Sequence, residues 1–346
     1  MNAFNQFKNL KGITAVISMC MILATLTASD AQTTRKGWKL IKIDGHEYVS
    51  VESLKNFYKF SKLTRSGGSI RLENAKVEMK LKIGGNECLM NNVKFIFSKP
   101  VIASGNDAYV SRFDLAKLID PVLRPNFIRN AGDFRTVILD AGHGGRDPGA
   151  TNSLGTEAAY NLRLAQRVQR LLQAQGFNVI MLRESNRYLS LKERVDSANR
   201  VKDNAIFLSL HFNSGSRTAR GIETFTLSPP GVSHYGRGLI ASDAQARAGN
   251  QHDSANIALA TALHGSVLRR LGTNTFDRGI KRARFTVLSG VRHPAVLFEG
   301  GFMSHPHEAK LIAHEAYQAA LAAGIVDSVV RYRFAVGGGK AASPRR

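Results

Sequence analysis

From Thr136 onward the chain alternates short apolar runs with longer amphipathic segments, and this alternation restricts the fold more than any other feature. Short apolar runs between turn residues predict buried strands, whereas apolar residues at every third or fourth position predict helices. Strands that alternate with helices build one sheet covered on both faces. We therefore predict an α/β domain over residues 134–333, in which helices flank a mostly parallel or mixed central sheet. The expected strands are 136–140, 178–182, 205–210, 223–227, 285–288 and 295–299, and the expected helices are 157–175, 190–200 and 254–271, with residues from about 308 to 332 mostly helical.

Residues 37–125 combine short strands, a helix-like segment and turns, which predicts a small α+β accessory domain. The pattern Tyr-Val-Ser-x-x-x-Leu occurs twice, at Tyr48 and at Tyr109, each time where a strand leads into a helix, and this repeat indicates a duplicated unit. The segment resembles the small N-terminal or stalk-like domain of copper amine oxidases, which is also appended to bacterial cell-wall enzymes. That resemblance implies a wall-binding or stalk role. Pro121 and Pro125 predict a stiff connection to the next domain.

The N-terminus has the pattern of an export signal. Lys8 and Lys11 precede an apolar stretch over residues 13–26, and small residues follow it up to Ala31, which predicts a secretory signal peptide over residues 1–31. A membrane anchor is the alternative, but the apolar stretch is shorter than the ~20 residues that a spanning helix needs. We therefore predict export to the periplasm, with no stable membrane anchor after cleavage. At the other end, the glycine-rich and then basic residues 334–346 predict a disordered tail.

The chain carries a formal net charge of +22, which is compatible with an anionic partner. For an exported protein, anionic cell-wall polymers and lipid head groups fit this charge. The basic residues are spread along the chain and form no motif with aromatic residues, so a generally basic surface is the alternative and no nucleic-acid partner is predicted. After removal of residues 1–31, Cys88 is the only cysteine, so no internal disulfide is expected and Cys88 is predicted to be a buried small hydrophobe.

Four side chains of the ligand or acid/base type stand where predicted strands or helices meet loops: His143, Glu157, His211 and Glu299. Three of them come at or just after the end of a predicted strand, where the loops of an α/β sheet converge on ligands. Glu157 instead begins a predicted helix, where a carboxylate that caps the helix is the alternative. Two imidazoles and a carboxylate are the ligand set of a catalytic zinc, and a further carboxylate can act as a base toward its water. The pattern predicts a metallohydrolase.

Other hydrolase classes lose support because their motifs are absent from the sequence. It contains no Gly-x-Ser-x-Gly nucleophile elbow, no Gly-x4-Gly-Lys-Ser/Thr phosphate loop, no Gly-x-Gly-x-x-Gly and no His-Glu-x-x-His. A serine hydrolase, an ordinary ATPase and a thermolysin-like protease are therefore not expected.

Several motifs around these four residues identify a family resemblance. From about Thr136 to Tyr332, in order, the chain resembles the zinc-dependent N-acetylmuramoyl-L-alanine amidases of the third amidase class. The resemblance is carried by residues 136–150, Glu157 with Asn161, Leu191, Arg194 and residues 198–199, residues 208–213, residues 221–224, Arg278 with Gly279, and residues 294–302.

The resemblance implies a function and a role for each residue. Zn2+ would be bound by His143, Glu157 and His211, with Glu299 as the catalytic acid/base. The substrate would be peptidoglycan, cut at the amide between N-acetylmuramic acid and the L-alanine of the stem peptide (EC 3.5.1.28 type), in cell-wall remodelling or cell separation. The alternative is a catalytically inactive peptidoglycan-binding protein on an amidase scaffold. The candidates for second-shell or substrate contacts are Asn161, Asn213 and Arg292.

An additional polar loop lies between Thr226 and Ser254. In some relatives an inserted helix in this part of the domain covers the zinc until an activator protein displaces it. The segment here is rich in glycine, proline and serine, so we expect a lid or substrate-binding loop, with an autoinhibitory helix and an activator partner as the alternative.

Overall fold

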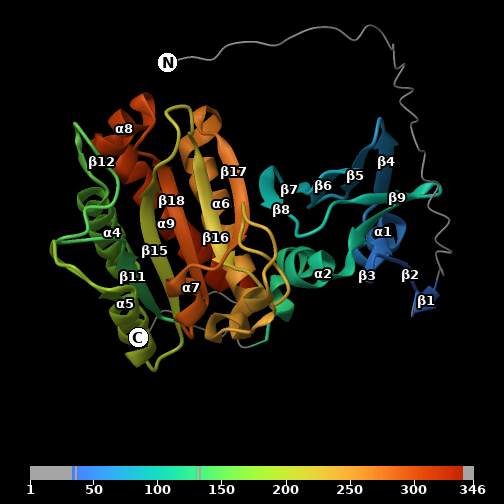
Figure 1. The fold of residues 1–346 in the computed structure, drawn as a ribbon, viewed down its shortest axis with the longest axis horizontal. Helices are drawn as coiled ribbons and strands as arrows, with labels where there is room; N and C mark the ends of the chain where they lie inside the picture. The colour runs from blue at the N-terminus through green and yellow to red at the C-terminus, as the bar shows by residue number, and fades with distance from the viewer. Residues whose placement is uncertain (1–32, 36, 130, 132–133, 338–346) are drawn as a thin grey trace, which may run out of the picture.

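The computed structural model describes residues 33–35, 37–129, 131 and 134–337 (Figure 1). The predicted signal peptide over residues 1–31 lies outside this part of the chain, as do residues 338–346 of the predicted tail. The tail prediction began too early, because residues 334–336 still belong to the last helix. Within the described residues, no helix is long and apolar enough to cross a membrane.

The strands after Thr136 form a mixed sheet in the order β14-β11-β15-β18-β16-β17. Neighbouring strands run parallel except for β18 and β16, which are antiparallel. This arrangement confirms the predicted mixed sheet. The strands are β11 (Thr136–Ala141), β14 (Asn178–Met181), β15 (Ala205–Asn213), β16 (Ile222–Leu227), β17 (Asp277–Ala283) and β18 (Ala295–Phe302), with a separate ribbon of β12 (Thr151–Asn152) and β13 (Gly155–Thr156).

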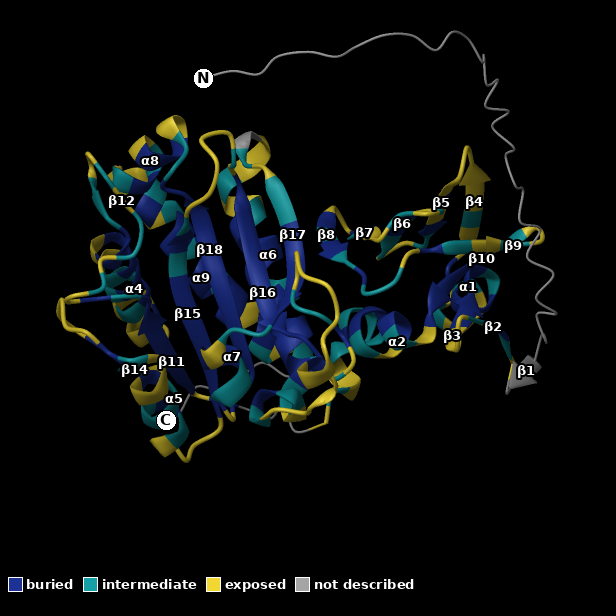
Figure 2. Ribbon diagram, viewed as in Figure 1, coloured by how far each residue is buried: buried dark blue, intermediate teal, exposed yellow. Residues whose placement is uncertain are grey.

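Helices cover both faces of this sheet, as the alternating sequence predicts (Figure 1). Along β11, Val137 and Leu139 face one core while Ile138 faces a second, because successive side chains of a strand point to opposite faces. The central strands are consequently buried on both sides (Figure 2). The first face packs against α4 (Glu157–Ala174), α6 (Asp253–Leu271) and α9 (Glu315–Val336), and the second against α5 (Leu191–Arg200) and α7 (Thr286–Gly290); α8 (Pro306–Ala313) follows β18.

Two secondary-structure predictions in this domain were wrong. Residues 285–288 form no strand, because α7 begins at Thr286; a short apolar run does not distinguish a strand from a buried helical turn. Strand β17 was missed, because charged residues such as Lys281 and Arg282 hide its pattern. Both side chains are nevertheless buried, and each has a polar partner on β16.

The accessory region contains a five-stranded sheet in which the two copies of the repeat pair with each other. Tyr48 lies opposite Ser111 and Tyr109 opposite Ser50 in an antiparallel ladder, and each serine hydroxyl accepts hydrogen bonds at the start of the following helix. This symmetry supports the predicted duplicated unit. The elements are β1 (Thr33–Arg35), β2 (Trp38–Ile43), β3 (His46–Ser50), β9 (Ile102–Ser104), β10 (Asp107–Ser111), α1 (Val51–Tyr58), α2 (Arg112–Asp114) and the π-helical η1 (Leu115–Ile119).

A meander of antiparallel strands joins the accessory region to the central sheet. Its last strand runs parallel to β17, with Phe95 opposite Ile280, so that both regions share one sheet of 11 strands. Cys88 is fully buried in this meander, as predicted, and burial raises the pKa of its thiol. The meander consists of β4 (Lys62–Ser66), β5 (Ser69–Glu73), β6 (Glu78–Lys82), β7 (Glu87–Met90) and β8 (Val93–Ile96).

The predicted stiff connection around residues 120–125 is helical. Helix α3 (Asp120–Leu123) carries Pro121 in its first turn, where proline costs no hydrogen bond, and a 3-10 turn, η2 (Pro125–Phe127), follows. Polar contacts also tie the two regions together. The Lys94 amide donates to the Asp277 carboxylate at 2.9 Å, and the Arg282 guanidinium donates to the Lys117 carbonyl at 2.6 Å.

Candidate metal centre

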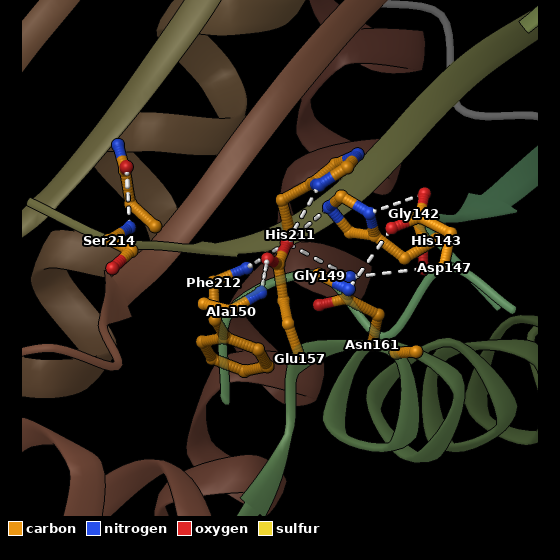
Figure 3. Close-up of polar contacts among 12 residues, drawn as sticks. Gly142, His143, Asp147, Gly149, Ala150, Glu157, Asn161, His211, Phe212 and Ser214 are labelled. Carbon is orange, nitrogen blue, oxygen red and sulfur yellow. Dashed lines mark hydrogen bonds and ion pairs between the residues drawn. The ribbon is translucent and has the colours of Figure 1, made fainter. Parts of the chain in front are cut away.

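Three side chains from three different elements converge at one end of the sheet (Figure 3). His143 lies just after β11, Glu157 is the first residue of α4, and His211 belongs to β15. One ligand atom from each residue lies within 4.8 Å of the ligand atoms of the other two. The backbone of His143 is left-handed, with a φ of 60°, a conformation that is uncommon for a residue other than glycine.

Glu157 lies between the two imidazoles. Its Oε1 is 2.9 Å from Nδ1 of His211 and 3.1 Å from Nε2 of His143. Burial alone raises the pKa of this carboxyl, but the two imidazoles outweigh burial and lower it, so that Glu157 is ionised. The capping role belongs to Thr156, whose hydroxyl accepts from the Ala159 amide at 3.3 Å. The geometry therefore favours the ligand reading of Glu157 over the helix-cap reading.

Gly142 and Gly149 have no side chain, and the side chains of the cluster pack into the space that this absence provides. A β-carbon at Gly142 would overlap the His211 ring. At Gly149, which has a φ of 65°, it would lie 2.6 Å from Oε2 of Glu157 and 2.7 Å from Cδ2 of His143. The glycines of this segment thus allow the close approach that brings the two histidines onto one carboxylate.

Asp147, which our sequence analysis did not single out, orients His143. Its Oδ2 lies 2.8 Å from Nδ1 of His143, on the far side of the ring from Glu157. Burial lowers the pKa of His143, but Glu157 and Asp147 outweigh that effect and raise it. A histidine that binds a metal through one nitrogen usually donates its other N–H to such a carboxylate.

We expect Asp147→Asn to weaken metal binding by roughly 10–100-fold, because the amide keeps the shape of the carboxylate but loses its charge. A competition titration of the purified protein with a chromophoric zinc chelator measures this change. Asp203→Asn, at an exposed position, is the matched control. Wild-type affinity in Asp147→Asn would show that the contact is not needed for metal binding.

Glu299 lies beside the three candidate ligands, on the neighbouring strand β18. It pairs with His211 on β15 and with Glu223 on β16, and only 9% of the residue is exposed. Its Oε2 is buried without a hydrogen-bond partner among the described residues. Burial raises the pKa of Glu299 well above its usual value, and the negative charges of Glu157 and Glu223 raise it further. Glu299 is thus suited to hold a proton.

The predicted placement of His211 and Glu299 at strand ends was wrong in detail. Strand β15 continues to Asn213 and β18 to Phe302, because the ladder between them extends past a register shift. Both site residues therefore project from within paired strands, which fixes their backbones more firmly than a loop would.

Two buried arginines, Arg183 and Arg194, hold the backbone that leads into His143. Arg183 donates from Nε to the Ala141 carbonyl at 2.7 Å and from Nη2 to the Gly142 carbonyl at 2.8 Å. Arg194 donates from Nη2 to the His143 carbonyl at 2.7 Å. Sequence reasoning gave neither a role, although Arg194 was part of the family motif, because only the tertiary fold brings them to this segment.

Of the three residues predicted to support the ligands or to contact substrate, the structure places two near the site and one away from it. Asn161 is fully buried and donates to the Gly142 carbonyl at 3.2 Å and to Glu157 Oε1 at 3.3 Å. Asn213 lines the cleft and donates to Oε1 of Glu223 at 2.6 Å. The structure does not bring Arg292 to the cleft, because this exposed residue precedes the N-terminal end of β18, at the opposite edge of the sheet from the site.

A cleft of about 610 Å³ opens over the candidate metal centre. Leu191 of α5 and Val287 of α7 form two of its walls, while His143, His211 and Glu299 line its polar end. The cleft thus gives an extended substrate access to the candidate ligands and to Glu299 at once.

The loop between Thr226 and Ser254 does not cover this cleft. No described residue between these positions lines it, and the loop contains only the 3-10 turns η3 (Ala241–Ala244) and η4 (Ala248–His252). Asp243 fastens the loop, because its carboxylate lies 2.8 Å from Arg237 and 2.8 Å from Arg284. Neither the expected lid nor the alternative autoinhibitory helix lies over the site in this structure.

The cluster fits a zinc ion. Two imidazole nitrogens and a carboxylate oxygen are close enough to share one ion, and these atom types are the zinc ligands of many hydrolases. Asp147 completes the usual support of a ligating histidine, and Glu299, one oxygen of which has no hydrogen-bond partner among the described residues, lines the same cleft.

Comparisons with known proteins point to one family. Residues 137–331, more than half of the chain, match the family described as N-acetylmuramoyl-L-alanine amidase. The uncharacterized protein YqiI of Bacillus subtilis (strain 168) is 32% identical over 198 residues, which cover 57% of this chain and 84% of that protein. The N-acetylmuramoyl-L-alanine amidase LytC of Bacillus subtilis (strain 168) is 30% identical over 208 residues, which cover 60% of this chain but only 37% of LytC. The solved structure of an N-acetylmuramoyl-L-alanine amidase from Clostridium difficile 630 has 30% sequence identity and a TM-score of 0.48, and the match covers 58% of this chain and 97% of that one.

Proposed function

The chain belongs to the N-acetylmuramoyl-L-alanine amidase family, and we propose that it hydrolyses the amide between N-acetylmuramic acid and the L-alanine of the peptidoglycan stem peptide. The observation that carries this proposal is the convergence of His143, Glu157 and His211 in the cleft that Glu299 also lines. Membership of the family indicates which amide bond is cut. The geometry of the site provides the side chains that metal-assisted hydrolysis of an amide needs.

We assign the metal as zinc, held by His143, Glu157 and His211. When bound there, zinc would supply a Lewis acid that polarises the scissile carbonyl and lowers the pKa of water to about 7. Asp147 holds the His143 ring in place, and Asn161 donates a hydrogen bond to Oε1 of Glu157, the oxygen that faces the two imidazoles.

Glu299 is the acid/base in this proposal. Its carboxylate takes a proton from the attacking water and delivers it to the nitrogen of the departing L-alanine. A group with this double task needs a pKa near the working pH, and burial beside two carboxylates shifts the pKa of Glu299 in that direction. Its backbone is held by ladders on both sides, so that the carboxylate stays beside the metal ligands.

The proposed setting is the bacterial cell wall. A net charge of +22 favours association with an anionic wall polymer, and the signal-peptide pattern of residues 1–31 favours export to the periplasm. We propose a wall-binding or stalk role for residues 37–125, whose strands β4 to β8 continue the sheet of the rest of the chain.

Purified sacculi test this function. We expect the zinc-loaded protein to release stem peptides with a free L-alanine amino group, and we expect a chelator to stop the release until zinc is restored. Mass spectrometry of the soluble peptides measures both. Binding to sacculi without any release would support the alternative, an inactive peptidoglycan-binding protein.

A further inference from the structure

Arg278 occupies the strand beyond Glu223, at the same end of the sheet as Glu299. Strand β16 lies between β18 and β17, so that Glu299, Glu223 and Arg278 come from three consecutive strands (Figure 1). The link to the cleft is short. Asn213 lines the cleft and donates to Oε1 of Glu223 at 2.6 Å, while Arg278 donates from Nε to Oε2 of Glu223 at 3.0 Å. The carboxylate of Glu223 thus connects Arg278 to Asn213, which lines the cleft.

The cluster around Glu223 carries a positive charge in excess. Glu223 is buried and forms ion pairs with two cations, Lys281 and Arg278. Lys281 is itself buried, with 2% of the residue exposed, so its charge is committed to Glu223. One carboxylate between two cations leaves one positive charge uncompensated, and Arg278 is the member of the cluster that reaches solvent, with 29% of its side chain exposed.

The guanidinium of Arg278 is fixed in orientation but not saturated with partners. Nε is held by Glu223, and Cζ lies 4.7 Å from the centre of the Phe302 ring. Nη1 reaches the Arg220 carbonyl only at 3.5 Å, and no described residue accepts a hydrogen bond from Nη2. A planar guanidinium with free N–H groups and a fixed plane is prepared for a carboxylate, because its fork matches the two oxygens.

We propose that Arg278 binds a carboxylate of the stem peptide, on the side of the peptide that leaves. This inference rests on the proposed amidase function and names a specificity residue for it. In a stem peptide that continues from L-alanine through γ-linked D-glutamate, the second residue carries a free α-carboxylate or its amide close to the scissile bond. Neighbouring strands lie about 4.8 Å apart, so the backbones that carry Glu299 and Arg278 are separated by roughly 10 Å across two strand spacings. Two extended residues, at about 3.3 Å each, together with the length of a hydrogen bond to the carboxylate, cover this distance. The enzyme then prefers the free acid over the amide.

Two muropeptides that differ only in this α-carboxylate or its amide test the inference. We expect the zinc-loaded wild type to cleave the acid with a kcat/KM about tenfold or more above that of the amide, since a charge-assisted hydrogen bond is lost with the amide. In Arg278→Gln this ratio falls to about one, chiefly through a higher KM for the acid. Arg278→Lys keeps the charge without the fork and retains part of the preference. Arg217→Gln, at an exposed arginine of the adjoining loop, keeps the full preference and is the matched control.

The outcomes separate this inference from the proposed function. A wild type that cleaves neither muropeptide, nor sacculi, contradicts the amidase function itself. A wild type that cleaves both equally, or an Arg278→Gln protein that loses activity on both while keeping the ratio, overturns the role of Arg278 and leaves the function intact. Should Arg278→Gln fail to fold, as judged by its thermal transition, the unchanged ratio of a folded Arg278→Lys protein would overturn it equally.

Discussion

Replacing Glu299 by glutamine is expected to lower kcat for the release of stem peptides by roughly 10²–10⁴-fold, the range found when a general acid or base is removed. The upper part of this range is expected, because the same carboxyl serves the attacking water and the departing amine in our proposal. Glutamine has nearly the same shape and preserves the buried environment between β15 and β16, but it cannot exchange a proton. Stem-peptide release from sacculi, followed with time at saturating zinc, measures the effect.

A loss of the metal would mimic this result, so the zinc content of Glu299→Gln must be measured as well. We expect one zinc per chain, because His143, Glu157 and His211 remain in place. Glu184→Gln, an exposed glutamate outside the cleft, controls for the loss of one negative charge. Release at the wild-type rate by zinc-loaded Glu299→Gln would remove Glu299 from the mechanism and would sink the assignment.

The fold could be predicted wherever a segment buries apolar side chains with a regular period. Strand β11 and helix α4 have such patterns and lie within a residue of their predicted bounds. Strand β17 could not be predicted, because its buried Lys281 and Arg282 are stabilised by partners on β16 that the local sequence does not reveal. The error over α7 has the opposite cause, since five residues are too few to show a helical period.

The two candidate histidine ligands could be predicted because their positions follow from the sheet topology, whereas Glu157, at the start of a helix, became a candidate ligand only together with them and with the family resemblance. Neighbouring parallel strands bring residues near their carboxyl ends to one edge, which places His143 and His211 together. Arg292 shows the limit of this reasoning: it lies close to Glu299 in sequence, but seven residues along an extended chain correspond to about 23 Å. The roles of Asp147 and Arg183 depend on how the loops around them fold. Loop sequences show no regular apolar period, so these roles could not be predicted.

Replacing Glu157 by alanine is expected to release the zinc. The carboxylate is the group between the two imidazoles, 2.9 Å from one and 3.1 Å from the other, and without it only two protein ligands are left. Since loss of a supporting residue already costs roughly 10–100-fold in affinity, loss of a ligand should exceed that range. We therefore expect substoichiometric zinc and no detectable stem-peptide release, measured by elemental analysis after dialysis and by the sacculus assay.

The helix-cap alternative for Glu157 makes a different prediction, and Thr156→Ala is the matched control for it. Thr156 supplies the cap hydrogen bond to the Ala159 amide, so its removal should cost about 1 kcal/mol of unfolding free energy while zinc content stays at one per chain. If Glu157→Ala behaves in the same way, with full zinc and only a lowered thermal transition, Glu157 is no ligand. The expected contrast is stronger when Glu299→Gln is included, because that variant should keep the metal and lose turnover, whereas Glu157→Ala should lose both. This pair of results requires three metal ligands and a separate acid/base. If Glu157 or Glu299 had a purely structural role, its replacement would lower stability and leave zinc content and turnover of the folded protein unchanged.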